Sequence, residues 1–282
     1  AGAGRRVSEA LVIRDLLAGR TDLETGLREG LSRYGIEPSA VHLESVFGFL
    51  SNRFVKTAEE AKQRRDIVFV EDDGAGGMRM AEQLREELAR SAEFRVMLAE
   101  LAGFMVSRYE ARFSKRHAGT DLVLYEKYTY EDVCRLLNWP TNMNAQNIGG
   151  YFYEKRTKTL PVFVNYHKAE DAIAYEDRFV SPSRIVALSK TKRRTTSADA
   201  DHIYKRTPED RDNRIFLFVR RNKEDKGEAK AFYFLGEVEA QGEPVPVTLP
   251  ATGDRAFEID YRLDVPVRPD IYAYITMAGD ES

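Results

Sequence analysis

Residues 215–236 read IFLFVRRNKEDKGEAKAFYFLG, and this stretch decides the fold of the second half of the chain. Two apolar runs rich in aromatic residues, 215–219 and 231–236, flank a polar segment that contains Gly227. Short apolar runs joined by a polar, glycine-containing turn are typical of two antiparallel strands. We therefore predict a β-hairpin whose turn lies between Asn222 and Glu228.

Short runs of the same kind continue on both sides of this hairpin. They lie at residues 151–153, 160–164, 184–188, 245–249, 256–261 and 271–275. No helix-length pattern separates most of them, and this favours antiparallel pairing over a doubly wound parallel sheet. We expect a mostly antiparallel sheet, either curled or closed into a barrel, in a β-rich domain at residues 141–282.

The first half of the chain has the periodicity of helices. Apolar residues recur at three- and four-residue spacing from Val7 to Leu17. Further helical segments are predicted at 22–35, at 38–50, from the capping box of Thr57 and Glu60 onward, at 78–116 with a break near Ser91, and at 129–139. The acidic, glycine-rich segment 71–77 is predicted to be a loop. The fold class is therefore α+β, with a helical bundle at residues 1–140 before the β-rich domain.

The composition is that of a globular protein. Of 282 residues, 43% are hydrophobic and 11% aromatic, which excludes intrinsic disorder, and no run approaches the ~18 apolar residues of a membrane-spanning helix. Cys134 is the only cysteine, so we exclude a disulfide framework and expect a cytoplasmic protein. The start at Ala1-Gly2-Ala3-Gly4 has neither a methionine nor a signal peptide, and we expect a fragment of a longer protein.

The charge is distributed unevenly along the chain. The formal net charge is −3, but residues 151–230 have a net charge of +6 and residues 231–282 one of −7. Binding to a phosphate backbone depends on the local density of Lys and Arg rather than on the charge of the whole chain. The basic segment therefore points to nucleic acid. The alternative is a solvated surface with uneven charge.

The strongest signal within the basic segment is the run SKTKRRTTS at residues 189–197. Four cations are interspersed with five hydroxyl groups, and both kinds of group contact phosphate oxygens in protein–DNA complexes. We predict that the DNA backbone is contacted by Ser189, Lys190, Thr191, Lys192, Arg193 and Arg194. The alternative is an exposed basic loop without a ligand.

Aromatic residues are abundant beside the basic run. Rings can stack on a base that is flipped out of a duplex, and a carboxylate can accept a hydrogen bond from the exocyclic amine of cytosine. We predict a pocket for a modified cytosine that is lined by Tyr151, Tyr153, Tyr166, Tyr175 and Asp177. The alternative is that the rings belong to the core and that the carboxylate pairs with a cation such as Arg178.

The common signatures of catalysis are absent from the sequence. It has no GxxxxGK[ST] phosphate loop and no GxSxG elbow, and its four histidines lack zinc-binding spacing. One arrangement is compatible with a Mg²⁺-dependent nuclease, namely Asp210 followed by Glu224 and Lys226. We keep this nuclease as an alternative that requires the three side chains to converge. Otherwise we expect no catalytic residue, metal or cofactor.

An ordered set of motifs extends over residues 120–275. It comprises YEKYTYEDVCRLLNW at 125–139, GGY at 149–151, PVFVNYHK at 161–168, YEDRF at 175–179, LFVR at 217–220 and FYFLG at 232–236. This set resembles the C-terminal region of SauUSI-type modification-dependent (type IV) restriction enzymes. The whole series in order is much more specific than any one of its members.

The resemblance implies the role of a specificity module. Enzymes of this family combine a phospholipase-D-like nuclease and an ATP-dependent helicase with a C-terminal region that recognises methylated or hydroxymethylated cytosine, on a fold similar to SRA or PUA-like β barrels. This chain would then be a non-catalytic fragment. Its partners would be double-stranded DNA with modified cytosine and the helicase and nuclease domains of the same polypeptide.

A coupling role without recognition of a modified base is the main alternative. In that case the helical part would bind a partner protein, and the basic run would be ordinary surface. This hypothesis predicts a large exposed apolar patch on the helical part. It also predicts that the chain has no affinity for DNA even at low salt.

Overall fold

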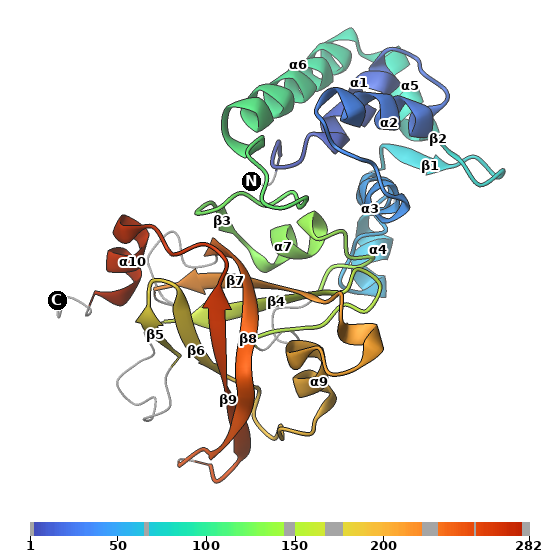
Figure 1. Ribbon diagram of the computed structural model, residues 1–282. Helices are drawn as coiled ribbons and strands as arrows, with labels where there is room; N and C mark the ends of the chain where they lie inside the picture. Colours follow the sequence, from blue (N-terminus) through green and yellow to red (C-terminus); the bar gives the residue numbers. More distant parts are fainter. Residues whose placement is uncertain are drawn as a thin grey trace. The chain divides into compact units, whose positions relative to one another are not determined.

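The computed structural model describes residues 3–64, 68–143, 150–166, 177–221, 231–250 and 252–277. The chain forms two compact units (Figure 1). The first unit comprises Ala1–Val123 and Glu131–Asn144, and the second comprises Leu124–Tyr130 and Ala145–Ser282. The segment Leu124–Tyr130 thus belongs to the second unit, although residues on both sides of it belong to the first.

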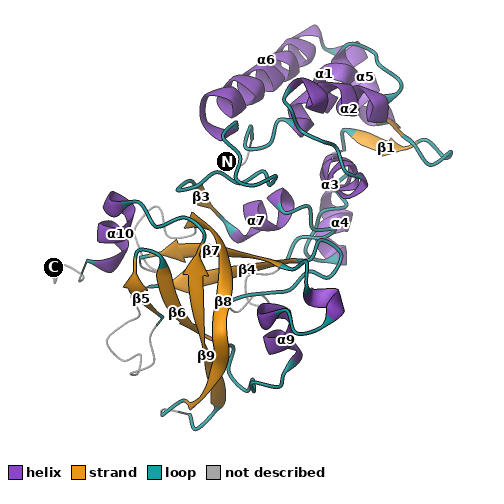
Figure 2. Cartoon of the chain, in the orientation of Figure 1, coloured by secondary structure: helices purple, strands orange, loops and turns teal. Residues whose placement is uncertain are grey.

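The first unit is mainly helical, as predicted (Figure 2). Its helices are α1 (Ser8–Leu17), α2 (Leu23–Arg33), α3 (Ala40–Leu50), α4 (Ala58–Arg64), α5 (Glu82–Arg90), α6 (Ala92–Arg108) with a π-helical turn at Tyr109–Phe113, and α7 (Tyr130–Leu136). The expected break near Ser91 is confirmed, because the Ser91 hydroxyl accepts a hydrogen bond from the Phe94 N–H at the start of α6. Such a cap satisfies a backbone donor that has no partner within the helix.

The predicted loop is confirmed at residues 73–77, but the segment that contains it differs from the prediction. It is a β-hairpin of β1 (Val70–Asp72) and β2 (Met78–Met80), and α5 begins at Glu82 rather than at residue 78. The Asp73 carboxylate accepts hydrogen bonds from the backbone N–H groups of Ala75 and Gly77, and these bonds close the turn. This local side-chain bonding competes with helix formation.

A buried cluster of charges joins α1, α3 and α7. Arg6 is fully buried and donates hydrogen bonds to Glu9, Ser45 and Asn138. Arg135 also donates a hydrogen bond to the Glu9 carboxylate, at 2.8 Å. Burial by itself would raise the pKa of the Glu9 carboxyl, but the guanidiniums of Arg6 and Arg135 outweigh burial and lower this pKa to about 2. The Glu9 carboxylate therefore pairs with two buried cations, and Asp132 lies 3.9 Å from Arg135 as a second partner.

Replacing Glu9 by Gln is expected to lower the free energy of unfolding by about 3–5 kcal/mol at pH 7, because it removes the ion pair of the buried Arg6 and the shorter of the two ion pairs of Arg135. The folded-state pKa of about 2 lies below the ordinary value of 4.5. The wild-type contribution is therefore complete above about pH 5 and is lost as the pH falls toward 2. Urea unfolding at pH 7 and at pH 3.5 measures both effects.

The matched control is Glu24→Gln, which removes an exposed ion pair with Arg28. This substitution is expected to cost less than about 1 kcal/mol. A Glu9→Gln protein as stable as this control at neutral pH would contradict the assigned role of Glu9.

The second unit is built on a seven-stranded sheet in the order β4-β7-β8-β9-β6-β5, with β3 also paired to β8. The strands are β3 (Lys127–Tyr128), β4 (Thr159–Asn165), β5 (Arg178–Ser181), β6 (Arg184–Leu188), β7 (Arg214–Arg220), β8 (Phe232–Thr248) and β9 (Arg255–Leu263). All neighbours pair antiparallel except β4 and β7. The mostly antiparallel sheet is confirmed, and so is the pairing of the strands that flank the predicted hairpin. The turn 222–228 lies outside the described residues.

The barrel alternative is wrong. Among the described strands, β4 and β5 stand at opposite ends of the order, and they do not pair with each other. The free edge of β4 is instead covered by single antiparallel bridges, from Tyr151 to Val162 and from Glu154 to Thr159. Residues 151–154 therefore occupy the edge of β4 to which another strand would have to pair to close a barrel.

Strand β7 shows why the sequence of this unit has continuous apolar runs. Its residues Ile215, Leu217 and Val219 face one hydrophobic core, and Phe216 and Phe218 are also fully buried. Phe218 lies 5.1 Å from both Phe163 and Phe234 between ring centroids. A strand buried on both faces is apolar throughout rather than alternating.

Two further differences concern short elements. The run 271–275 is not a strand but part of helix α10 (Pro269–Thr276), in which Pro269 stands in the first turn and Ile271 and Ile275 are buried one turn apart. Helix α9 (Ala198–Tyr204), which follows the basic run, was not predicted. None of the helices in the described part of the chain is long and apolar enough to cross a membrane.

Candidate functional site

The basic run begins as a continuation of strand β6. Ser189 donates its N–H to the carbonyl oxygen of Phe257 on β9, and the Ser189 hydroxyl accepts the N–H of Phe257, both at 2.9 Å. Ser189 is accordingly buried. Its hydroxyl therefore fastens the loop to β9 rather than facing solvent, whereas Thr191, Lys192 and Arg194 are exposed.

The buried side chain of Tyr151 stabilises the basic loop through hydrogen bonds. The Tyr151 hydroxyl donates to Asp199 on α9 at 2.8 Å and accepts the N–H of Lys190 at 3.3 Å. Asp199 also accepts a hydrogen bond from the guanidinium of Arg193 at 2.8 Å. Burial, followed by the charge of Asp199, raises the pKa of Tyr151 far above its ordinary value, so the hydroxyl keeps its proton. Tyr151 thus positions both Lys190 and Arg193.

Lys190 lies above aromatic rings. Its Nζ is 5.0 Å from the ring centroid of Tyr151 and 5.8 Å from that of Phe152. Burial lowers the pKa of Lys190, and the neighbouring Asp199 opposes that effect. Lys190 and Tyr151, which were assigned to different parts of the site, therefore lie in direct contact.

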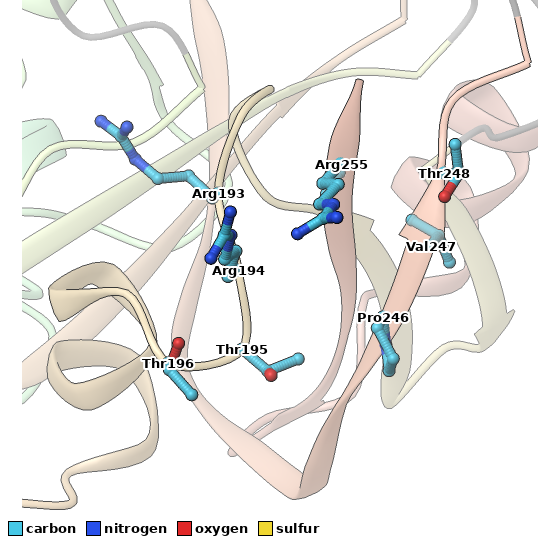
Figure 3. A pocket seen from close by; sticks show the side chains of 9 residues that line it. Arg193, Arg194, Thr195, Thr196, Pro246, Val247, Thr248 and Arg255 are labelled. Atoms are coloured by element: carbon cyan, nitrogen blue, oxygen red, sulfur yellow. The ribbon is translucent and has the colours of Figure 1, made fainter. Parts of the chain in front are cut away.

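The loop forms one wall of a hollow of about 340 Å³ (Figure 3). Residues 193–196 of the loop line one side, and residues 246–248 at the end of β8 and 255–256 at the start of β9 line the other. Figure 3 shows Arg194 and Arg255 on facing walls of this hollow. We call these lining residues the arginine hollow.

The arginine hollow is suited to an anion. Its lining residues include three arginines and three threonines and no Asp or Glu, and Figure 3 shows the side chain of Arg193 directed away from Arg194 and Arg255. Arg193 is paired with Asp199, whereas Arg194 and Arg255 form no ion pair with any residue that the structure describes. A guanidinium presents a planar set of N–H donors that matches the oxygens of a phosphate or carboxylate group. Two such groups are thus available to one ligand.

Residues 122–275, more than half of the chain, match the model of a family described as "Domain of unknown function (DUF3427)". The chain belongs to this family. Residues 2–111 match a second domain of unknown function, DUF8090. A comparison with curated proteins found no match.

A comparison with solved structures found chains that are similar to part of this chain. One of them is the DNA recognition domain of the cytosine modification-dependent restriction endonuclease LpnPI, at 13% identity over 58% of this chain and 84% of that chain, with a TM-score of 0.34. A likeness of this degree assigns no function. The description of the DUF3427 family names none either, so the resemblance to type IV restriction enzymes stays a prediction.

The arginine hollow lies within the DUF3427 segment, and sequence reasoning found only one of its walls. Arg255 belongs to the acidic tail of the chain, where no local signal marks it. The pairing of β6 with β9, in which Leu188 faces Glu258, brings the loop beside Arg255. Knowledge of that strand pairing would have been enough to identify Arg255.

The other predicted pocket residues lie apart from the arginine hollow. Tyr153 stacks on His202 of α9 at 4.0 Å, and Tyr166 lies 5.6 Å from Phe179 of β5. Asp177 accepts the N–H of Leu188 at 2.9 Å. Tyr175 lies outside the described residues. None of the predicted pocket residues that the structure describes lines the arginine hollow.

Asp210, which the nuclease alternative requires, has a structural role. Asp210 is buried and accepts hydrogen bonds from Thr207 and Asn213, and it bonds to Nδ1 of His202 at 2.7 Å. Glu224 and Lys226 lie outside the described residues. Among the residues that the structure describes, no group of three His, Cys, Asp or Glu side chains could hold a metal ion.

Tyr151→Phe is expected to lower the free energy of unfolding by about 1–3 kcal/mol, because it leaves the Lys190 N–H and one bond of Asp199 without their partner. The control is Tyr34→Phe, which removes an exposed hydrogen bond to Glu110. Urea unfolding of both variants provides the comparison. A loss no larger than that of the control would show that the hydroxyl of Tyr151 does not support the loop.

Proposed function

We propose that the second unit binds double-stranded DNA and that the arginine hollow receives a phosphate of its backbone. The observation that supports this proposal most directly is the pair of guanidiniums, Arg194 and Arg255, that face each other without an acidic partner among the described residues. The hydroxyls of Thr195 and Thr248 supply further hydrogen bonds. Guanidinium and hydroxyl groups are the usual donors to DNA phosphates.

A polymer of phosphates fits this surface better than a single small anion. Lys192 is exposed on the same loop and Arg193 is partly exposed, so positive groups continue beyond the hollow along residues 192–194. Contacts of this kind act together on successive phosphates and release condensed counterions. The proposal therefore includes a strong dependence of affinity on salt.

The acidic residues of β9 do not oppose this positive surface. Glu258 is paired with Arg178 of β5, and Asp260 is paired with Arg184 of β6. Asp199, which contacts the loop, is paired with Arg193. Both acidic residues of β9 are thus paired with cations from neighbouring strands.

The finer part of the proposal is that the DNA contains methylated or hydroxymethylated cytosine, read by base flipping. It is supported by the motifs shared with SauUSI-type enzymes. We propose that Tyr166, Tyr175 and Asp177 inspect the base, while Tyr151 and Tyr153 hold the elements behind it. A methyl group is worth only about 0.8 kcal/mol of burial, so a shaped enclosure must provide the remaining selectivity.

The double substitution Arg194→Ala and Arg255→Ala is expected to weaken binding to a labelled duplex at least about tenfold at low salt. It should also reduce the slope of log affinity against log salt by about 1.8, because two phosphate contacts are lost. Fluorescence anisotropy over a range of salt concentrations measures both quantities. The matched control is Arg262→Ala, an exposed arginine of β9 that is paired with Glu239.

Two results would contradict DNA binding at the arginine hollow. One is an unchanged salt slope in the double variant, and the other is the absence of any affinity of the wild-type protein at low salt. The second result would favour the coupling role instead.

The finer proposal has a separate test. Otherwise identical duplexes with unmodified, methylated and hydroxymethylated cytosine are titrated with the wild-type protein. We expect at least about fourfold tighter binding to one modified duplex, which is the factor that the burial of one methyl group can provide. Equal affinity for all three at every salt concentration would remove modified-base recognition and leave DNA binding intact.

A further inference from the structure

Helix α6 of the first unit exposes an apolar stripe. It consists of Phe94, Met97, Leu101 and Phe104, whose exposed fractions are 37%, 65%, 42% and 57%. Of the eight large hydrophobic residues that are exposed in the described part of the chain, five lie on this helix, Val96 being the fifth. Single exposed apolar residues are ordinary, but a contiguous group marks an interaction surface.

The stripe is separate from the side of α6 that packs into the first unit. Leu98, Ala102, Met105 and Val106 are buried on that other side. The core of the unit therefore does not need the exposed stripe. The spacing of three, four and three residues from Phe94 to Phe104 is that of the seam along which one helix packs on another.

The flank of the stripe is acidic. Glu93 and Glu100 are seven residues apart, so they lie on the same side of the helix, next to Met97 and Phe104. Neither carboxylate forms an ion pair within the described residues, although other glutamates of this unit do so. The two arginines of α6 are used elsewhere, because Arg95 donates to the carbonyl oxygen of Leu17 and Arg108 to that of Ala3.

We propose that α6 is the docking site for a basic amphipathic helix of a partner protein or domain. Its apolar residues, spaced three and four apart, would pack on Phe94, Met97, Leu101 and Phe104. Lys or Arg side chains beside that seam would pair with Glu93 and Glu100. This is the recognition of a helix through an apolar face with charged edges.

A second copy of this chain fits the stripe less well. Two antiparallel α6 helices paired around the centre of the stripe would bring their Glu100 carboxylates to the same edge of the interface. Like charges at the edge of a helix pair disfavour that pairing. The acidic flank therefore argues for a partner with the opposite charge.

The test uses the full chain and two labelled synthetic peptides. Both form amphipathic helices with leucine at the seam positions, and they differ only in having Lys or Glu at the edge positions. The Lys peptide is expected to bind at least about tenfold more tightly than the Glu peptide, because its lysines attract Glu93 and Glu100 whereas glutamates would be repelled by them. Anisotropy titrations at low salt give both affinities.

Two variants locate the binding on α6. Met97→Glu with Leu101→Glu should abolish binding of the Lys peptide, and Glu93→Lys with Glu100→Lys should reverse the preference between the peptides. All four positions are exposed, so the urea midpoint of unfolding should stay close to that of the wild type. The matched control is Glu86→Lys, an exposed position on the neighbouring helix α5.

The proposal is overturned if neither peptide binds, if both bind equally, or if the charge-reversed variant keeps the wild-type preference. Sedimentation provides a further outcome. A wild-type dimer that the Met97→Glu and Leu101→Glu substitutions dissociate would identify the occupant as a second copy and overturn the proposed partner. None of these results depends on whether the second unit binds DNA.

Discussion

The two hydrogen bonds between Ser189 and Phe257 hold the start of the basic loop against β9, beside the arginine hollow. They extend the pairing of β6 and β9 by one residue, just before the chain leaves the sheet. The cations that follow Ser189 must therefore pass beside the first residues of β9. This attachment brings the loop to the wall of the hollow that faces Arg255.

The packing below the loop shows how a charged surface is built on an apolar sheet. Tyr151 fills the space between strand β4 and helix α9, and its hydroxyl links the backbone of Lys190 to the carboxylate of Asp199. Asp199 in turn fixes Arg193. One buried ring thus orders two cations, and the remaining guanidiniums stay available because the acids of β9 are paired with arginines of β5 and β6.

The two units present surfaces of different chemistry. The arginine hollow of the second unit is suited to phosphates, while the apolar stripe of α6 in the first unit is suited to a helix. The coupling hypothesis predicted an exposed apolar patch on the helical part, and such a patch is present. DNA binding and partner binding are therefore compatible functions of one chain, because they need different residues.

The sequence by itself determined the helical first part, the break near Ser91 and the apolar strand β7, since each of these follows from local spacing and side-chain chemistry. It also marked the basic loop. Only the tertiary structure decided that the sheet stays open, that Tyr151 lies under the loop, and that Arg255 faces Arg194. These features depend on which strands pair and in what register, and strand register is set by contacts between residues far apart in the chain.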